Sequence, residues 1–282
     1  MRKIFTCLCV GFFFLSPLYS ELNEWSGKEY SKHSSVQMEQ AQEMIKRLDL
    51  KGGEWILDVG CGDGKISALL AEKVPKGMVI GIDPSPSMLE QAHKVKLAYP
   101  FANLQFESGR AETFLYPHAF DVIVSLYVMH WIPDHLKALT NIRSHLAEGG
   151  KAYFVIATPK DDLPLGRALK RITEEWKTYF ADFKTNQVFY DLEGYKNLFK
   201  KAGLQIEELR YTCHRTYHKN IQEWGNWIAQ WLPHVKFLAP SDREAFIHRL
   251  QQLYIEESGQ MRPSRAPILY TEYALIIEAS RF

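Results

Sequence analysis

The sequence predicts an α/β fold in which helices cover both faces of a largely parallel sheet. Up to Thr158, short apolar runs of strand length alternate with stretches whose apolar residues recur at helical spacing. Such alternation is typical of successive β-α-β units, whose strands lie parallel and are buried on both faces. The chain of 282 residues, 46% apolar and 24% charged, can hold one such domain and an accessory cap.

The first half follows this alternation closely. Its expected strands are Ile56–Val59, Met78–Asp83, Leu104–Phe106, Phe120–Leu126 and Lys151–Thr158. Its helices are expected from Ser34 or Ser35 to about Leu50, from Pro86 behind the cap residue Ser85, and from Pro133 to Leu146. Gly149 and Gly150 are expected to form a turn before the fifth strand.

The second half is richer in helices. The pattern predicts helices at Leu165–Phe180, Leu192–Ala202 and Ile221–Leu232, another capped near Ser241, and strands at Leu204–Tyr217 and Ile268–Ala279. Trp224, Trp227 and Trp231 lie on one face of the third of these helices. Such a stripe is usually core packing, and over the carboxyl ends of the strands it would also make an apolar substrate pocket.

Residues 1–20 differ from the rest of the chain. Arg2 and Lys3 precede an apolar stretch, Ile4–Leu15, and a Ser-Pro segment follows. This is the layout of a signal peptide, which indicates export or membrane attachment, and it is too short for a stable membrane span. A mistaken start site or a helix packed on the domain are the alternatives. We expect one domain over residues 21–282, with its core at about 35–158 and cap contributions from 21–50 and 219–262.

Composition argues against several classes of partner. The net charge is +1 with no long basic run, so no nucleic-acid partner is expected. Only Cys61 and Cys213 lie outside the N-terminal segment, which rules out a disulfide framework. Cys213, His214 and His218 lack a second pair at metal-ligand spacing, so we expect no metal site.

The stretch Ile56–Ser67 combines a strand, a glycine-rich turn and the start of a helix. Glycines leave backbone bare, so that a ligand can lie against it. The spacing is G-x-G-x-G, and Lys65 stands where the dinucleotide pattern requires its third glycine. Asp58 at the strand end would repel a pyrophosphate and attract an ammonium group. A ligand with adenosine at one end and a cationic amino acid at the other fits both facts, which predicts S-adenosylmethionine.

The second strand also ends in an acid. Asp83 stands nineteen residues after Gly64, and its carboxylate can accept both hydroxyls of a ribose. A lone strand-end Asp is often only a helix cap, but together with the glycine turn the ribose role is favoured. Met88, just beyond, could pack on the adenine face. Ligands of open α/β sheets lie outside the carboxyl ends of the strands, so these residues would share one site.

The fourth strand leads into a second group of candidate residues. It delivers Ser125, and His130 and Trp131 follow shortly after. His130 is the candidate catalytic residue, as a general base or as a group that positions the acceptor. Positioning is favoured because methyl transfer from a sulfonium needs little acid–base help when the acceptor is already anionic. Trp131 is expected to form a wall of the pocket.

Four motifs together resemble the class I S-adenosylmethionine-dependent methyltransferases. They are Asp58-Val59-Gly60-Cys61-Gly62-Asp63-Gly64, Gly81-Ile82-Asp83-Pro84-Ser85-Pro86-Ser87-Met88-Leu89, Phe120-Asp121-Val122-Ile123 and Leu146-Ala147-Glu148-Gly149-Gly150. The resemblance implies a seven-stranded Rossmann-like sheet with an antiparallel last strand and a helical cap. Within the superfamily, Tyr30, Gln37, the Met129–His135 block and the tryptophan-rich cap resemble the trans-aconitate, juvenile hormone acid and malonyl-carrier-protein carboxyl methyltransferases.

The resemblance also implies a role for each site residue. Cofactor-binding residues would be Asp58, Gly60, Gly62 and Gly64 at the methionine end, Asp83 at the ribose, Met88, Arg110 and Ala111 at the adenine, and Ser125 near the sulfonium. Tyr30, Gln37, His130 and Trp131 would face a small-molecule acceptor. The family commonly has Asp where this chain has Arg110, which offers no acceptor to the adenine amino group. Either the arginine stacks on the base, or Glu112 or a backbone carbonyl accepts instead.

The resulting hypothesis is carboxyl O-methylation of a small molecule by in-line displacement, without a metal. The alternatives are a quinone-type C-methyltransferase and a non-catalytic binding protein that retains the fold. A nicotinamide oxidoreductase is disfavoured by Lys65 and Asp58. Localisation stays open, because the leader indicates export whereas the cofactor is made in the cytosol.

Overall fold

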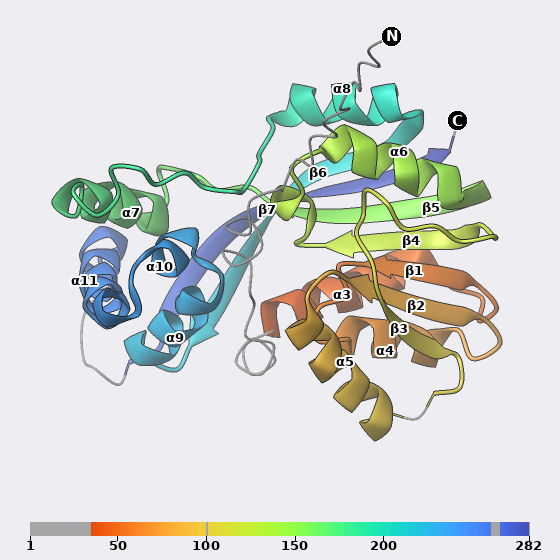
Figure 1. Cartoon of the computed structure of the whole chain (residues 1–282), viewed down its shortest axis with the longest axis horizontal. Coiled ribbons are helices and arrows are strands. Elements are labelled where there is room, and N and C mark those ends of the chain that lie inside the picture. The colour runs from red at the N-terminus through yellow and green to blue at the C-terminus, as the bar shows by residue number, and fades with distance from the viewer. Residues whose placement is uncertain (1–34, 100, 261–265, 282) are drawn as a thin grey trace, which may run out of the picture.

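The structure is a computed structural model that describes residues 35–99, 101–260 and 266–281. Its centre is a seven-stranded sheet of order β3-β2-β1-β4-β5-β7-β6 (Figure 1). The strands are β1 (Trp55–Val59), β2 (Met78–Asp83), β3 (Leu104–Ser108), β4 (Phe120–Leu126), β5 (Leu146–Ala157), β6 (Leu204–His218) and β7 (Ile268–Arg281). β7 runs antiparallel to both β5 and β6, and the remaining pairs are parallel. The predicted seven-stranded sheet with an antiparallel last strand is confirmed.

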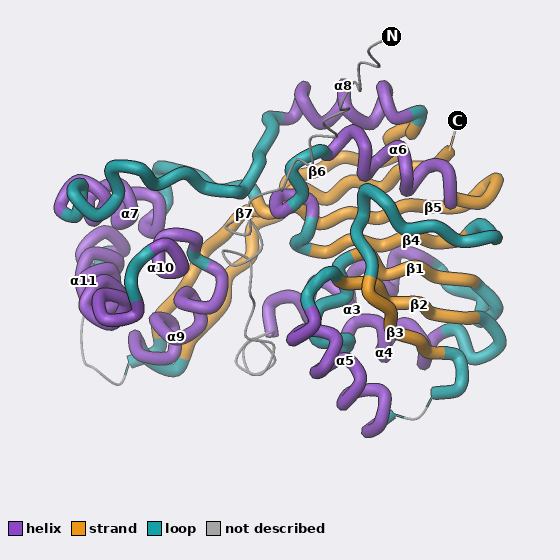
Figure 2. The backbone as a smooth tube through the Cα atoms, in the orientation of Figure 1, coloured by secondary structure: helices purple, strands orange, loops and turns teal. Residues whose placement is uncertain are grey.

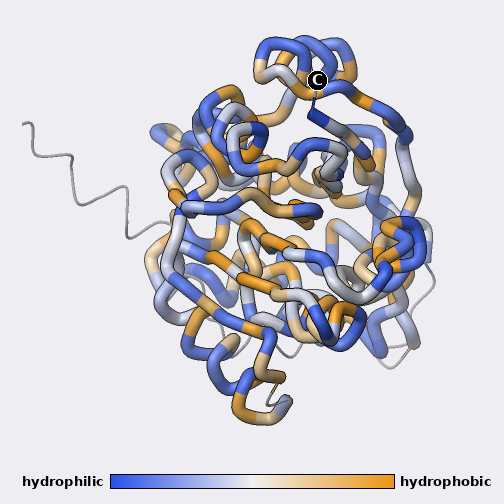
Figure 3. Tube along the Cα trace, turned by 90° about the vertical axis from the view of Figure 1, so that its right-hand side faces the viewer, coloured by the Kyte–Doolittle hydropathy of each residue, from blue (hydrophilic) through white to orange (hydrophobic). Residues whose placement is uncertain are grey.

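Helices cover both faces of the sheet because the strands are apolar on both sides (Figure 2). One face carries α3 (Ser35–Leu48), α4 (Lys65–Lys73) and α5 (Pro86–Ala98), and the other carries α6 (His135–His145) and α8 (Leu192–Ala202). In β1, Ile56 packs toward α3 and α4, whereas Leu57 and Val59 pack toward α6. Figure 3 shows the apolar segments gathered along the strands in the middle of the molecule.

A separate group of helices packs beside the parts of β6 and β7 that extend past β5 (Figure 1). This cap consists of α7 (Pro164–Glu175), α9 (Ile221–Trp231), α10 (Pro233–Phe237) and α11 (Pro240–Ser258). Trp224 stacks on Tyr254 with ring centroids 4.2 Å apart, and Trp227 contacts Tyr270 of β7 at 4.8 Å. These buried tryptophans therefore serve as packing, as their spacing predicts.

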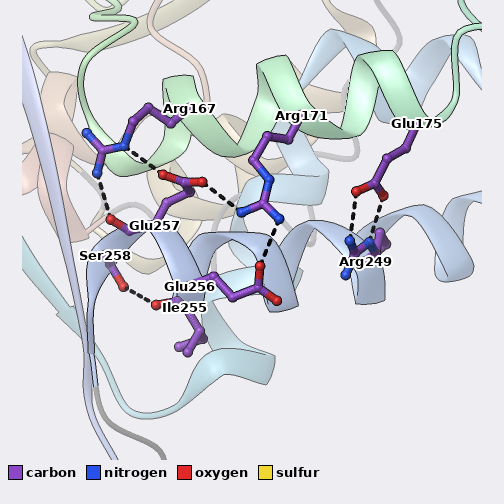
Figure 4. A network of polar contacts seen from close by, with 8 residues as sticks. All are labelled: Arg167, Arg171, Glu175, Arg249, Ile255, Glu256, Glu257 and Ser258. Atoms are coloured by element: carbon purple, nitrogen blue, oxygen red, sulfur yellow. Dashed lines mark hydrogen bonds and ion pairs between the residues drawn. The ribbon is translucent and has the colours of Figure 1, made fainter.

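Ion pairs fasten α7 to α11 (Figure 4). The carboxylate of Glu257 accepts from Arg167 Nε at 2.8 Å and from Arg171 Nη1 at 2.7 Å. One turn of helix away from Arg171, Glu175 accepts from two nitrogens of Arg249, each at 2.7 Å. The bidentate and shared geometry gives these pairs more specificity than isolated surface pairs have. These ion pairs make α7 part of the cap. Helix α3, in contrast, packs on the sheet.

Two of the expected elements have an end that differs from the prediction by five residues. β5 begins at Leu146, because a register shift between Phe120 and Val122 lets Phe120 pair with Leu146. Gly149, at φ 72°, lies inside this strand instead of ending a turn before it. The helix expected to reach Phe180 ends at Glu175, where Trp176 leaves helical geometry and the following residues form turns. The bulge and the early helix end are both local backbone deviations that hydrophobic spacing does not encode.

Helices in the described part of the chain do not combine the length and apolar character needed to cross a membrane. The predicted leader lies outside the described residues.

Candidate functional site

The glycine turn after β1 is bound to the end of β2 by its backbone. The amides of Gly60 and Cys61 both donate to the carbonyl of Ile82, at 2.8 and 3.0 Å, and the amide of Gly62 donates to Asp83 Oδ2 at 3.1 Å. Gly60, Gly62 and Gly64 have φ values of 78°, 54° and 79°. These left-handed values explain why the turn uses glycine at alternate positions. The glycine turn and the end of β2 therefore lie together at the edge of the sheet where the parallel strands end.

Gly60 also permits a close approach from β4. A Cβ atom at this position would lie 2.3 Å from Val128 Cγ2. The segment that follows β4 therefore packs directly on the glycine turn. The short 3₁₀ helix η1 (Met129–Trp131) comes next in the chain, so His130 and Trp131 follow directly after a residue that contacts the turn.

Three carboxylates gather at this edge. Asp58 Oδ2 accepts from Ser67 Oγ at 2.6 Å, and Asp83 Oδ1 accepts from the amide of Ser85 at 2.8 Å. Asp63, which the sequence reasoning did not single out, is buried and lies 3.0 Å from Lys65 Nζ. Burial raises the pKa of Asp58 to about 7, and the neighbouring charges of Asp83 and Asp63 add to this rise. Burial also raises the pKa of Asp83.

This edge offers oxygen acceptors and bare backbone, and it would repel a phosphate. An ammonium group beside Asp58 would compensate its burial, and hydroxyl groups would satisfy Asp83. The residues present therefore fit a ligand that carries a cationic amino acid and a ribose. They do not fit a dinucleotide, whose pyrophosphate would meet Asp58.

The residues expected around the adenine lie at the ends of β2 and β3. Met88 is buried in the first turn of α5, and Ala111 is buried after β3. The Arg110 side chain is 59% exposed, and its Nη2 lies 3.9 Å from Glu112 Oε1. An exposed guanidinium is free to lie over a flat ring, whereas Glu112 offers the acceptor that arginine lacks.

The residues after β4 form a covered apolar corner. His130 is buried, and its ring stacks on Phe189 at 5.6 Å and contacts Trp131 at 5.3 Å. Its Nδ1 has no hydrogen-bond partner among the described residues. Burial, helped by His135, lowers the pKa of His130 to about 3, so the imidazole is neutral at physiological pH. Ser125, one strand residue before the end of β4, is fully buried.

The contacts of two residues predicted to face the acceptor are not described. Tyr30 lies outside the described residues, and Gln37 lies in the first turn of α3 with its side chain likewise outside the description. Two hydrogen-bonded pairs of side chains that the sequence does not indicate involve strands β6 and β7. Tyr127 OH donates to Glu272 Oε1 at 3.0 Å, and Gln40 Nε2 lies 2.5 Å from His214 Nδ1. The sequence signal for Glu272 is weak, because it is one of two acids in a largely apolar strand.

No three His, Cys, Asp or Glu side chains in residues 35–99, 101–260 and 266–281 converge as a metal site would require. Cys213, His214 and His218 follow one another along β6, and Cys213 is exposed.

Fold and site together define a Rossmann-like methyltransferase: a sheet with an antiparallel β7, a glycine turn after β1 and an acid at the end of β2. The family model described as "Methyltransferase domain" matches residues 33–209, so the chain belongs to that family. It is a class I S-adenosylmethionine-dependent methyltransferase, which confirms the predicted family and cofactor.

Individual relatives agree with this assignment. A trans-aconitate 2-methyltransferase of Escherichia coli (strain 55989 / EAEC) is 25% identical over 249 residues, which cover 85% of this chain and 94% of the relative. The YcgJ protein of Bacillus subtilis has a TM-score of 0.58 at 20% identity, covering 86% of this chain and 97% of that one. Phosphoethanolamine N-methyltransferase 2 of Haemonchus contortus, solved with phosphomonomethylethanolamine and S-adenosylhomocysteine, has a TM-score of 0.53 at 18% identity, over 86% and 52% of the two chains. The two structures share the fold.

The close approach at Gly60 predicts a large effect of one methyl group. Gly60→Ala combines left-handed backbone with a clash against Val128, whereas Gly149→Ala has a similar φ of 72° and no atom within 4 Å of its Cβ. We expect Gly60→Ala to lower the free energy of unfolding by about 1–3 kcal/mol more than Gly149→Ala, and urea unfolding measures both. Equal losses in the two variants would contradict this account of the turn.

Proposed function

We propose that the chain methylates a carboxyl oxygen of a small molecule. The observation that carries this proposal is the state of His130, whose buried imidazole has a pKa of about 3 and is therefore a poor proton acceptor. A carboxylate arrives already ionised and needs no base, whereas a hydroxyl or carbon acceptor must lose a proton. The similarity to proteins named trans-aconitate 2-methyltransferase supports the same class of acceptor.

The donor would lie along the edge that β1 and β2 form. Asp58 would receive its ammonium group, and Gly60, Gly62 and Gly64 would leave backbone bare for the methionine chain. Asp83 would hold the ribose hydroxyls, because Gly62 and Ser85 already orient its carboxylate. Met88 and Ala111 would contact the adenine with Arg110 beside it, and Ser125 would lie near the sulfonium.

The contribution of the protein to the reaction would be alignment and the exclusion of water. S-adenosylmethionine, when bound, supplies an electrophilic methyl group on a sulfonium. His130 and Trp131, with Tyr30 and Gln37, would hold the acceptor oxygen in line with the methyl carbon. The contact of Val128 with the glycine turn and that of Phe189 with His130 would keep water from the reacting atoms.

The ribose role of Asp83 predicts a loss of cofactor affinity in Asp83→Asn. Hydrogen bonds to a charged group contribute about 1.5–3 kcal/mol, so we expect the Kd for S-adenosylhomocysteine to rise roughly 10- to 100-fold in titration calorimetry. Asp134→Asn is the matched control, because Asp134 caps α6 through the amide of Lys137 and asparagine caps equally well. A folded Asp83→Asn protein with unchanged Kd would contradict the ribose assignment.

The raised pKa of Asp58 predicts that cofactor affinity depends on pH. Without a cation beside it Asp58 is mostly protonated at pH 6, and a bound ammonium group stabilises the ionised form, so binding must release a proton below about pH 7. We expect S-adenosylhomocysteine to bind roughly tenfold more weakly at pH 6 than near pH 7.5. Calorimetry in two buffers of different ionisation enthalpy measures the proton release.

The control for this pH dependence is Asp58→Asn, which removes the titrating group and keeps the shape of the side chain. It should bind with the same affinity at both pH values and release no proton. Proton release that survives the substitution would assign the effect to another group.

The acceptor class predicts the chemistry of the product. We expect label from methyl-labelled S-adenosylmethionine to enter a base-labile ester when the protein is incubated with a panel of carboxylic acids that includes trans-aconitate. Mild alkali should release that label as methanol. A labelled product that survives alkali would overturn the carboxyl assignment and favour the quinone-type C-methyltransferase alternative.

A further inference from the structure

β7 extends past the carboxyl end of its neighbour β5. The register of these antiparallel strands ends at Ala157 and Ala274, and one more backbone bond joins the amide of Thr158 to the carbonyl of Tyr273 at 2.9 Å. Residues 268–272 of β7 project beyond this edge and pair with β6. Glu272 lies in this projecting part. Ligands of open α/β sheets bind outside the carboxyl ends of the parallel strands. Glu272 therefore stands on the ligand side of the sheet.

Tyr127 connects Glu272 to the glycine turn. It is the first residue after β4, it has a φ of 59°, and its amide donates to the carbonyl of Val155 at 2.7 Å. A left-handed backbone is unfavourable for an aromatic residue and persists only where the surroundings impose it. Here it accompanies the hydrogen bond from the Tyr127 hydroxyl to Glu272 Oε1. The next residue, Val128, is the one that packs on Gly60.

Glu272 has hydrogen-bond donors around it but makes no ion pair within the described residues. Tyr127 faces it from the end of β4, Tyr270 hydrogen-bonds to it from its own strand, and His214 is its cross-strand neighbour on β6. From α3, the neutral amide of Gln40 contacts His214. Burial raises the pKa of Glu272 to about 7, although both tyrosine hydrogen bonds act in the opposite direction.

We propose that Glu272, oriented by Tyr127, binds the acceptor carboxylate as a neutral acid, donating its proton to one acceptor oxygen and leaving the other free to attack the methyl group. This inference rests on the proposed carboxyl acceptor. A carboxylate brought beside Glu272 favours its protonated form, because two like charges cannot easily ionise together. The shared proton would thus recognise an acid without an arginine.

The proton stays on Glu272 throughout the reaction. One oxygen–carbon bond forms to the methyl group, one carbon–sulfur bond breaks, and the electron pair of that bond goes to sulfur. The ester that results carries no charge, so its hydrogen bond to Glu272 is weaker than that of the carboxylate. Methylation would therefore loosen the product from the group that held the substrate.

The first test needs no acceptor. Infrared difference spectra of the intact protein against E272Q should show a neutral carboxyl band that disappears as the pH rises through about 7. In Tyr127→Phe the midpoint should shift upward, because the hydroxyl that stabilises the ionised form is gone. A carboxyl of Glu272 that is ionised at all pH values above 5 would overturn the proposal.

The second test uses turnover of an acid from the labelled panel, with trans-aconitate as the first probe. We expect the KM of the wild type to rise as the pH increases above neutrality, with kcat little changed. E272Q keeps a neutral hydrogen-bond donor, so it should retain a low KM and lose this pH dependence, whereas E272A should raise KM roughly 10- to 100-fold. Glu278→Gln, on the same strand and paired with Arg47 at 2.5 Å, is the control and should match the wild type.

The opposite pattern would assign Glu272 as a base. In that case activity would rise with pH, and E272Q would lose kcat as severely as E272A, which overturns the proposal. Equal KM values in all variants would overturn it as well. Failure of the proposed function is recognised separately, because a base-stable product rejects the carboxyl acceptor whatever the infrared titration of Glu272 shows.

Discussion

The site depends on the hydrogen bonds that hold the glycine turn to the end of β2. The carbonyl of Ile82 accepts from two successive amides of the turn, and the carboxylate of Asp83 accepts from a third. These bonds fix the backbone in left-handed geometry that only glycine adopts without strain. Because Gly60 has no side chain, Val128 can also contact the turn. The residues that follow β4 therefore begin directly at the glycine turn.

This arrangement leaves negative charge at the edge. Asp58, Asp63 and Asp83 are all buried, and Lys65 forms an ion pair with Asp63. Burying carboxylates without cations is unfavourable, and the raised pKa values of Asp58 and Asp83 express that cost. A ligand that brings an ammonium group and hydroxyl donors would offset the cost of burying these carboxylates. The edge is thereby suited to a ligand of this kind and would repel phosphate-bearing ones.

Local features of the sequence are enough to predict that Asp58, the glycines and Asp83 meet at one edge of the sheet. Asp58, the glycines and Asp83 lie within one β-α-β unit, where spacing along the chain determines position at the sheet edge. The proposed acceptor side is less predictable, because the contacts of Glu272 join residues that are distant in sequence. Tyr127 and Glu272 are 145 residues apart, and the left-handed backbone of Tyr127 leaves no trace in composition. Helix α7 is a similar case. The sequence shows its apolar face, but the ion pairs and apolar contacts with α11 that place it in the cap join residues far apart in the chain.

The order of elements along the chain separates the strands of the proposed donor site from the helices of the cap. Helices α9–α11 stand between β6 and β7, so changes in them leave the register of β1, β2 and β4 untouched. β7 belongs to both parts, since its carboxyl half lies in the sheet against β5 while Ile268 and Tyr270 pack in the cap. Glu272 stands between these two halves and contacts Tyr127, whose neighbour Val128 packs on the glycine turn. β7 therefore joins the cap to the glycine turn through Glu272 and Tyr127.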